Sequence, residues 1–247
     1  MKKITISSSV VASLAAGAIL LTALPAFAAT TGVKASATVS LPTLIAKADT
    51  AITARIADLN KLNARVQAMK NESGAEKANI STQVQTNITG LTTLKAKIDA
   101  DTDVTVARTD AATIFSTFRI YALVVPQGDI LAAADRVTTI NGLMTTLGTK
   151  MQARITADQA AGKDVSALTS AMTDMNAKIA DAGTQSQTAQ SGVINLVPDQ
   201  GNKTTEASNH AALLAARTNI KTSTADLKAA RQDVKTILAG LKTLGAK

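Results

Sequence analysis

The sequence predicts an all-α protein, built as an elongated bundle of five to six long antiparallel, coiled-coil-like helices. Three observations support this prediction. Apolar residues recur every three or four positions through most of the chain after residue 40, which is the repeat of one helix face. No alternating strand pattern of useful length is found. The chain has only four prolines, so few positions would interrupt a helix.

The first 28 residues have the order of a secretory signal peptide. Its parts are Lys2 and Lys3, an apolar run from Val10 to Leu24, and the small-residue cleavage site Ala26-Phe27-Ala28. The apolar run is shorter than the roughly 20 residues of a membrane-spanning helix. We therefore expect cleavage after Ala28 and an extracytoplasmic protein, whether periplasmic, cell-surface or secreted, with no transmembrane segment left. A flexible leader over 29–40 would precede a helical bundle domain at 41–247.

The first two predicted helices are joined by a short turn. Ser40 has the position of an N-cap, and Pro42 follows in the first turn, where a missing N–H costs nothing. This helix should end near "KNESG". Ser73 and Glu76 form a capping-box pair that would start the second helix. Because so few residues join them, the two helices should pack antiparallel.

The third predicted helix starts after "DADTD" and runs through the apolar stretch towards Pro126, which should end or kink it. The fourth carries Ile130, Val137, Met144 and Met151 at intervals of seven, and "AAGKD" breaks it. Asp164 should cap the fifth helix, whose apolar series extends to Leu196. After the turn "VPDQGNK", the last helix has an unbroken heptad series from Leu213 to Leu241, which "TSTAD" at 222–226 could kink.

Charge and composition limit the classes of partner. The formal net charge is +8, and there is no cysteine, so stability must come from packing without disulfides. A basic excess favours contact with anionic surfaces. We expect an envelope protein or an anionic envelope polymer as the partner. A specific nucleic-acid partner is not expected, because the basic residues are dispersed and lack stacking aromatics. The heptads would serve an intramolecular bundle or a homo-oligomer equally well.

The residues that usually carry catalysis are scarce. His210 is the only histidine, and without cysteine the usual zinc ligand sets cannot form. The sequence has no phosphate-cradling glycine loop and no nucleotide fingerprint. We therefore predict that the protein is not an enzyme and has no cofactor, with calcium as the one alternative.

The segment "DADTDVTVARTD" at 99–110 is the reason to consider a bound calcium ion. Asp99, Asp101, Asp103 and Asp110 occupy positions 1, 3, 5 and 12 of an EF-hand-like loop. Val104 stands where such a loop needs glycine. The other interpretation is a helix–helix linker whose aspartates cap the next helix.

All aromatic residues after the expected cleavage site lie in "TIFSTFRIYALVVPQGD" at 113–129. They are Phe115, Phe118 and Tyr121. On a helix, Phe118 and Tyr121 would share a face, and the stretch from 120 to 125 is apolar nearly all round, which favours burial. Tyr121 would then direct its hydroxyl to a polar partner. The alternative is an exposed hydrophobic patch that binds a partner.

Three segments carry a resemblance to a known group: "LKAKIDADTDV", "RIYALVVPQGDILAAADRV" and "LGTKMQARI". They resemble uncharacterised secreted all-helical proteins of small-genome candidate-phylum bacteria, over most of residues 41–245. The resemblance implies export and helical structure. That group has no assigned activity, so the resemblance implies no mechanism.

These observations give three functional hypotheses. The first is an exported non-enzymatic structural or interaction protein of the cell envelope. The second is a periplasmic holdase-type chaperone, and the third is a calcium-stabilised surface protein that uses residues 99–110.

Overall fold

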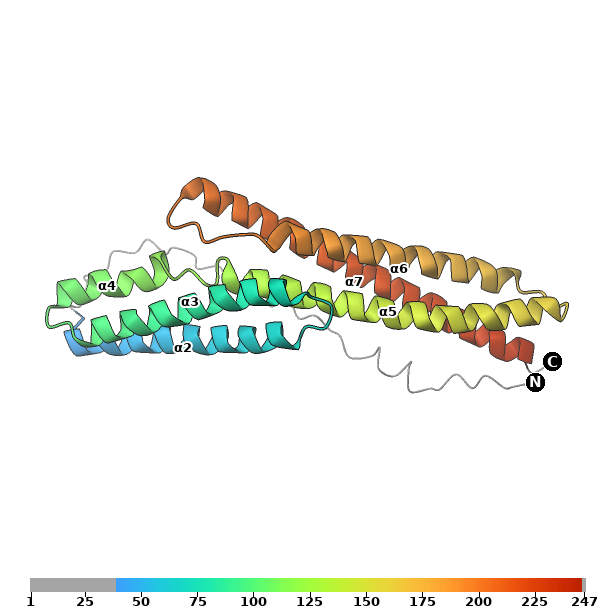
Figure 1. The fold of residues 1–247 in the computed structure, drawn as a ribbon, viewed down its shortest axis with the longest axis horizontal. Coiled ribbons are helices and arrows are strands. Elements are labelled where there is room, and N and C mark those ends of the chain that lie inside the picture. Colours follow the sequence, from blue (N-terminus) through green and yellow to red (C-terminus); the bar gives the residue numbers. More distant parts are fainter. Residues whose placement is uncertain (1–38, 246–247) are drawn as a thin grey trace. The chain divides into compact units, whose positions relative to one another are not determined.

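A computed structural model describes residues 39–245, which belong to one compact unit. Every regular element in this part of the chain is an α-helix, and the helices pack on one another, which confirms the all-α bundle (Figure 1). The predictions for the signal peptide and for most of the leader lie outside the described residues. With the labels of Figure 1, the helices are α2 (Leu41–Ala68), α3 (Gly74–Asp99), α4 (Val104–Ser116), α5 (Val124–Ala160), α6 (Ser166–Val193) and α7 (Lys203–Gly245).

The helices form two groups that share α5. In the first group, α2, α3 and α4 contact one another, and the start of α5 packs on α2 and α3. In the second group, α5, α6 and α7 contact one another (Figure 1). The polar pairs Gln67–Ser81, Asn141–Ile179 and Lys178–Asp233 show that α2–α3, α5–α6 and α6–α7 run antiparallel, as predicted. None of helices α2–α7 is both long and apolar enough to cross a membrane.

The predicted third helix was wrong in its extent, because α4 ends at Ser116 and α5 begins at Val124. A helix continuing through Pro126 would lose one backbone hydrogen bond and bring the proline ring against the carbonyl of Ala122. The chain instead turns at 117–123 and starts a new helix with Pro126 in its first turn, where no N–H is needed. Ile120, Leu123 and Val124 are buried at this break, so the apolar stretch does enter the core, but as a turn.

Polar side chains fix the register between helices. Ser186 donates to the carbonyl oxygen of Ala134 at 3.2 Å, and Ser223 donates to that of Ala182 at 2.9 Å. Both serines are buried, and each hydroxyl has its hydrogen-bond partner on the facing helix. Small residues at these positions also let the helix backbones approach closely.

Helix α7 is continuous through "TSTAD", so the kink considered there does not interrupt it. Thr222 and Thr224 each donate to the carbonyl oxygen four residues earlier, and Ser223 donates across to α6. Ser and Thr are poor helix formers because their hydroxyls can bond to backbone groups in non-helical conformations. Here the three hydroxyls bond to helix carbonyls, so they do not break α7. The apolar series predicted for the fifth helix extended one residue too far, because its last member, Leu196, lies beyond the end of α6.

Methionines fill the interface between α5 and α6. Met144, Met151, Met172 and Met175 are all buried. Gly148 lies beneath two of them, and a Cβ added there would come within 3.0 Å of the Met175 Cε and 3.1 Å of the Met172 Cε. The flexible thioether chains fill the space that the glycine leaves.

Candidate functional site

The turn between α4 and α5, residues 117–123, is one of the places at which the two helix groups meet. The turn contains Phe118, Arg119 and Tyr121, and Phe115 lies just before it on α4. Contacts from this segment reach α2, α3 and the connection between α6 and α7, as described below. We define the aromatic-turn surface as Arg55, Phe115 and Tyr121.

Arg55 of α2 lies between two aromatic rings. Its guanidinium carbon is 4.7 Å from the centre of the Phe115 ring and 5.2 Å from that of Tyr121. Both distances are within the range of cation–π attraction. Nη1 of Arg55 also donates to the carbonyl oxygen of Ala51 at 3.1 Å, which limits the motion of the side chain. The guanidinium of Arg55 therefore contacts both aromatic rings and joins α2 to the end of α4 and to the turn that follows it.

Tyr121 is half-buried and directs its hydroxyl to a polar partner, as the sequence predicted. The hydroxyl donates to Oδ2 of Asp58 at 2.8 Å. This hydrogen bond is the main cause that lowers the pKa of Asp58. Burial, followed by the bond to Asp58, raises the pKa of Tyr121, and burial lowers the pKa of Arg55. The phenol therefore stays protonated and remains a donor to the carboxylate.

The other two aromatics have different environments. Phe118 packs on α3, where a Cβ added to Gly90 would lie only 2.5 Å from its Cε1 and 2.7 Å from its Cζ. Phe115 is 61% exposed. The prediction that Phe118 and Tyr121 share one helix face was wrong, because α4 ends at Ser116, before both residues.

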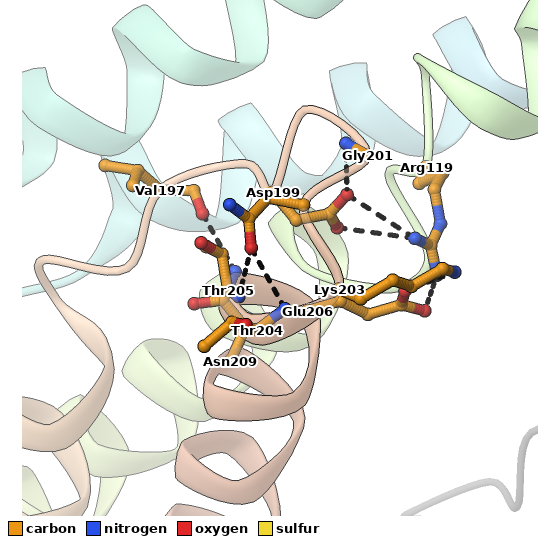
Figure 2. Close-up of polar contacts among 10 residues, drawn as sticks. Arg119, Val197, Asp199, Gly201, Lys203, Thr204, Thr205, Glu206 and Asn209 are labelled. Carbon is orange, nitrogen blue, oxygen red and sulfur yellow. Dashed lines mark hydrogen bonds and ion pairs between the residues drawn. The ribbon is translucent and has the colours of Figure 1, made fainter.

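Arg119 joins the turn to the start of α7 (Figure 2). Its Nη2 pairs with Oε1 of Glu206 at 2.5 Å, and its Nη1 lies 3.5 Å from both carboxylate oxygens of Asp199. The Arg119 guanidinium is the main cause that holds the pKa of Glu206 down at about 2, with Lys203 as a second partner. The Glu206 carboxylate is therefore charged at neutral pH when it meets the arginine.

The loop around Asp199 is fixed by its own hydrogen bonds. Oδ1 of Asp199 accepts from the N–H of Gly201 at 2.9 Å, at a turn where Gly201 has a φ of 83°. Asn202 accepts from the N–H groups of Thr204 and Thr205 and so starts α7. Nδ2 of Asn209 donates to the carbonyl of Val197 (Figure 2). Arg119 thus binds a preformed structure.

A second polar cluster ties the α2–α3 connection to α5 and α6. Oδ1 of Asp135 accepts from the N–H groups of Lys70 and Asn71 at 2.7 and 2.6 Å. Nε2 of Gln190 donates to Oε2 of Glu72 at 2.6 Å. Burial, together with the nearby charges of Glu76 and Asp135, raises the pKa of Glu72 to about 7. A weak acid that titrates near neutral pH therefore lies at this connection.

Three of the four aspartates of the 99–110 segment have separate partners, whereas Asp101 lies near Asp110, and burial followed by the charge of Asp110 raises the pKa of Asp101. Asp99 pairs with Lys95 at 2.8 Å and Asp110 with Lys97 at 2.7 Å. Asp103 caps α4 by accepting from the N–H groups of Thr105 and Val106. Among residues 39–245, no group of three or more acidic or histidine side chains is placed to hold a metal ion. The geometry therefore favours the linker interpretation over the calcium loop.

The sequence identified the aromatic residues but missed the partners that define their roles. Arg55 and Asp58 lie on α2, more than 60 residues before Tyr121, and Glu206 lies 87 residues after Arg119. His210 is exposed on α7. Comparisons with protein-family models, with curated proteins and with solved structures find no match for the chain.

Proposed function

We propose that the protein is an exported, non-enzymatic helical protein of the cell envelope that binds another envelope protein through the aromatic-turn surface. The observation that carries this proposal is the exposure of Phe115 beside Arg55. The exported location follows from the signal-peptide pattern of the sequence.

The chemistry of the aromatic-turn surface suits protein recognition. Tyrosine and arginine are among the residues that most often dominate the free energy of binding at interfaces, and aromatic residues are enriched there. Phe115 offers a large apolar ring, and Arg55 offers a cation whose face already lies on two rings. A partner could cover the ring and pair with the guanidinium at the same contact.

The surface is also held in place before any partner binds. Tyr121 is bonded to Asp58, Phe118 packs on Gly90, and Arg119 is paired with Glu206. Anchoring the turn on α2, α3 and α7 reduces the conformational entropy that binding would cost. A rigid surface of this kind suits specific recognition of one partner.

The test is a crosslinking pull-down of the purified protein against native envelope fractions, with Phe115→Ala as the variant. Phe115 is preferred to Phe118 because truncating Phe118 would leave a space against Gly90. Leu143→Ala is the matched control, since Leu143 is another exposed apolar residue, on α5. We expect one dominant partner that is captured by the native protein and by Leu143→Ala but is lost with Phe115→Ala.

Two results would contradict the proposal. Equal capture of the partner by Phe115→Ala would show that the aromatic-turn surface does not bind it. If no partner is captured and the protein instead suppresses aggregation of an unfolded client, the holdase-type chaperone replaces the interaction protein.

A further inference from the structure

Helix α7 carries a row of evenly spaced lysines on its outer face. Lys221, Lys228, Lys235 and Lys242 stand seven residues apart, and all four are exposed. At 1.5 Å per residue, successive lysines are separated by about 10.5 Å along the helix. Each follows directly after a member of the buried series Ile220, Leu227, Val234 and Leu241. The packing of α7 in the bundle therefore fixes the direction in which this lysine row faces.

The lysine row has no neutralising partners within α7. A carboxylate three or four residues away is the usual partner on a helix surface. None of the four lysines has an acidic residue at either spacing in either direction. Among residues 39–245, no ion pair includes any of them, whereas Lys61, Lys95, Lys97, Lys163, Lys178 and Lys203 are all paired.

The charges of α7 are sorted between its two flanks. Asp233 pairs with Lys178 of α6, so this acid faces α6. Asp226 stands seven residues earlier, at the same heptad position. One side of the lysine row holds small or neutral residues, among them Thr222, Ala225, Gln232, Thr236 and Ala239. On the other side, Arg217 and Arg231 stand three or four residues from lysines of the row and add further positive charge. The positive potential of the row is therefore not cancelled by side chains on the outer face of the helix.

We propose that the lysine row binds a single extended strand of a phosphate-bearing polyanion. Lysine ammonium groups act as point charges that suit phosphate, and four in line match a linear chain of charges. Between Lys221 and Lys242 no large apolar residue is exposed for insertion into a bilayer, and the exposed Leu214 stands one heptad before the first lysine of the row. The face also lacks aromatics on which bases could stack, so binding would be independent of sequence.

This site is separate from the aromatic-turn surface, so either proposal can fail without the other. The lysine row runs from the middle of α7 towards its C-terminal end, whereas α7 meets the α4–α5 turn through Glu206 near its start. The row adds a second class of partner, a polymer, to the proposed protein partner.

The experiment measures binding of the purified full chain to linear inorganic polyphosphate by titration calorimetry over a range of salt concentrations. The test variant replaces Lys221, Lys228, Lys235 and Lys242 with Gln. The control variant replaces Lys47, Arg108, Arg136 and Lys150 with Gln, which removes the same charge from exposed residues outside the row. Far-ultraviolet circular dichroism checks that both variants remain helical.

We expect the row variant to bind at least about tenfold more weakly at low salt, and its salt dependence to lose a slope of about 3, as four lost phosphate contacts predict. The control variant should lose less than half of this effect. Equal losses in both variants would show attraction by net charge alone and would overturn the proposal.

Two further probes separate the proposed ligand from related ones. Polyglutamate tests whether any polyanion suffices, and row-dependent binding as tight as that of polyphosphate would remove the preference for phosphate. Vesicles that contain anionic phospholipid test a membrane surface. If the vesicles bind more tightly than polyphosphate and the row variant abolishes that binding, the row is a membrane contact and the polymer proposal is wrong.

Discussion

Gly128 of α5 lies directly against the Leu62 side chain of α2. A Cβ added to Gly128 would lie 3.0 Å from Cγ of Leu62 and closer still to Cδ1. Both residues are buried, so neither can move into solvent. This contact joins the first helix group to the start of the shared helix α5, and a side chain at residue 128 would prevent it.

Gly128→Ala should therefore destabilise the protein in spite of alanine's better helix propensity. Overpacking a buried contact costs typically about 1–3 kcal/mol, whereas replacing glycine by alanine inside a helix gains at most about 1 kcal/mol. Urea unfolding followed by circular dichroism measures the net change. Gly142→Ala on the same helix is the control, because nothing lies within 4 Å of its added Cβ, and this variant should be more stable. Stabilisation by both substitutions would refute the close contact.

Arg119→Ala should weaken the connection between the α4–α5 turn and α7. The substitution leaves the buried Asp199 without its arginine, and losing the partner of a buried acceptor costs about 1–3 kcal/mol. Lys203→Ala, which removes an exposed partner of Glu206, should cost little. Chemical unfolding gives the free energies, and hydrogen exchange over residues 197–209 should rise in Arg119→Ala alone. Unchanged exchange in that segment would show that Arg119 does not hold it.

The Glu72 cluster should make stability depend on pH near neutrality. Its pKa rises from an ordinary 4.5 to about 7 in the folded protein. Between these values the folded state holds a proton that the unfolded state has released, so the contribution of Glu72 to stability is greatest below about pH 4.5 and declines as the pH rises to 7. After allowance for solvent screening of this half-buried group, we expect a loss on the order of 1 kcal/mol. Unfolding free energies measured between pH 5 and pH 8 test this.

The same pH series with Glu72→Gln separates this cluster from other groups. The amide cannot ionise beside Glu76 and Asp135, so the decline between pH 5 and pH 8 should flatten. Asp181→Asn, at an exposed aspartate of α6, should leave the decline unchanged. If the unfolding free energy of Glu72→Gln declines as much as that of the native protein, a group other than Glu72 causes the pH dependence.

Calcium should not alter the melting temperature of the protein. Asp99 and Asp110 are paired with lysines, and Asp103 caps α4, so the segment would have to give up these interactions to surround a cation. Thermal unfolding followed by circular dichroism in excess calcium and in excess chelator measures the difference. A melting temperature several degrees higher in calcium would restore the EF-hand-like interpretation of residues 99–110.

The periodic part of the fold could be predicted from the sequence because each helix carries its own signals. The capping box of Ser73 and Glu76 forms as expected, and the heptad series of α7 faces the core from Leu213 to Leu241. Helix period and end signals depend on neighbouring residues, which a sequence displays directly.

The break between α4 and α5 and the candidate site could not be predicted in the same way. The apolar stretch before Pro126 satisfies a helix pattern, and the proline disfavours a helix only over the residues next to it, so the end of α4 as early as Ser116 has no local signal. The partners of the turn, such as Glu206 for Arg119, are distant in sequence and carry no local signal. The four lysines of the row stand at intervals of seven in the sequence, but only the structure shows that Asp233 of the same helix faces α6 and not the row.

Oxidation of the methionines buried around Gly148 would report how often the second helix group opens to solvent. Peroxide converts a thioether to a sulfoxide only where the sulfur meets solvent. Met144, Met151 and Met175 have no measurable exposure in the closed bundle. A sulfoxide at one of these methionines would therefore show that the interface of α5 and α6 had opened. Because the sulfoxide is polar and its neighbours are apolar, it would also hinder the helices from packing together again.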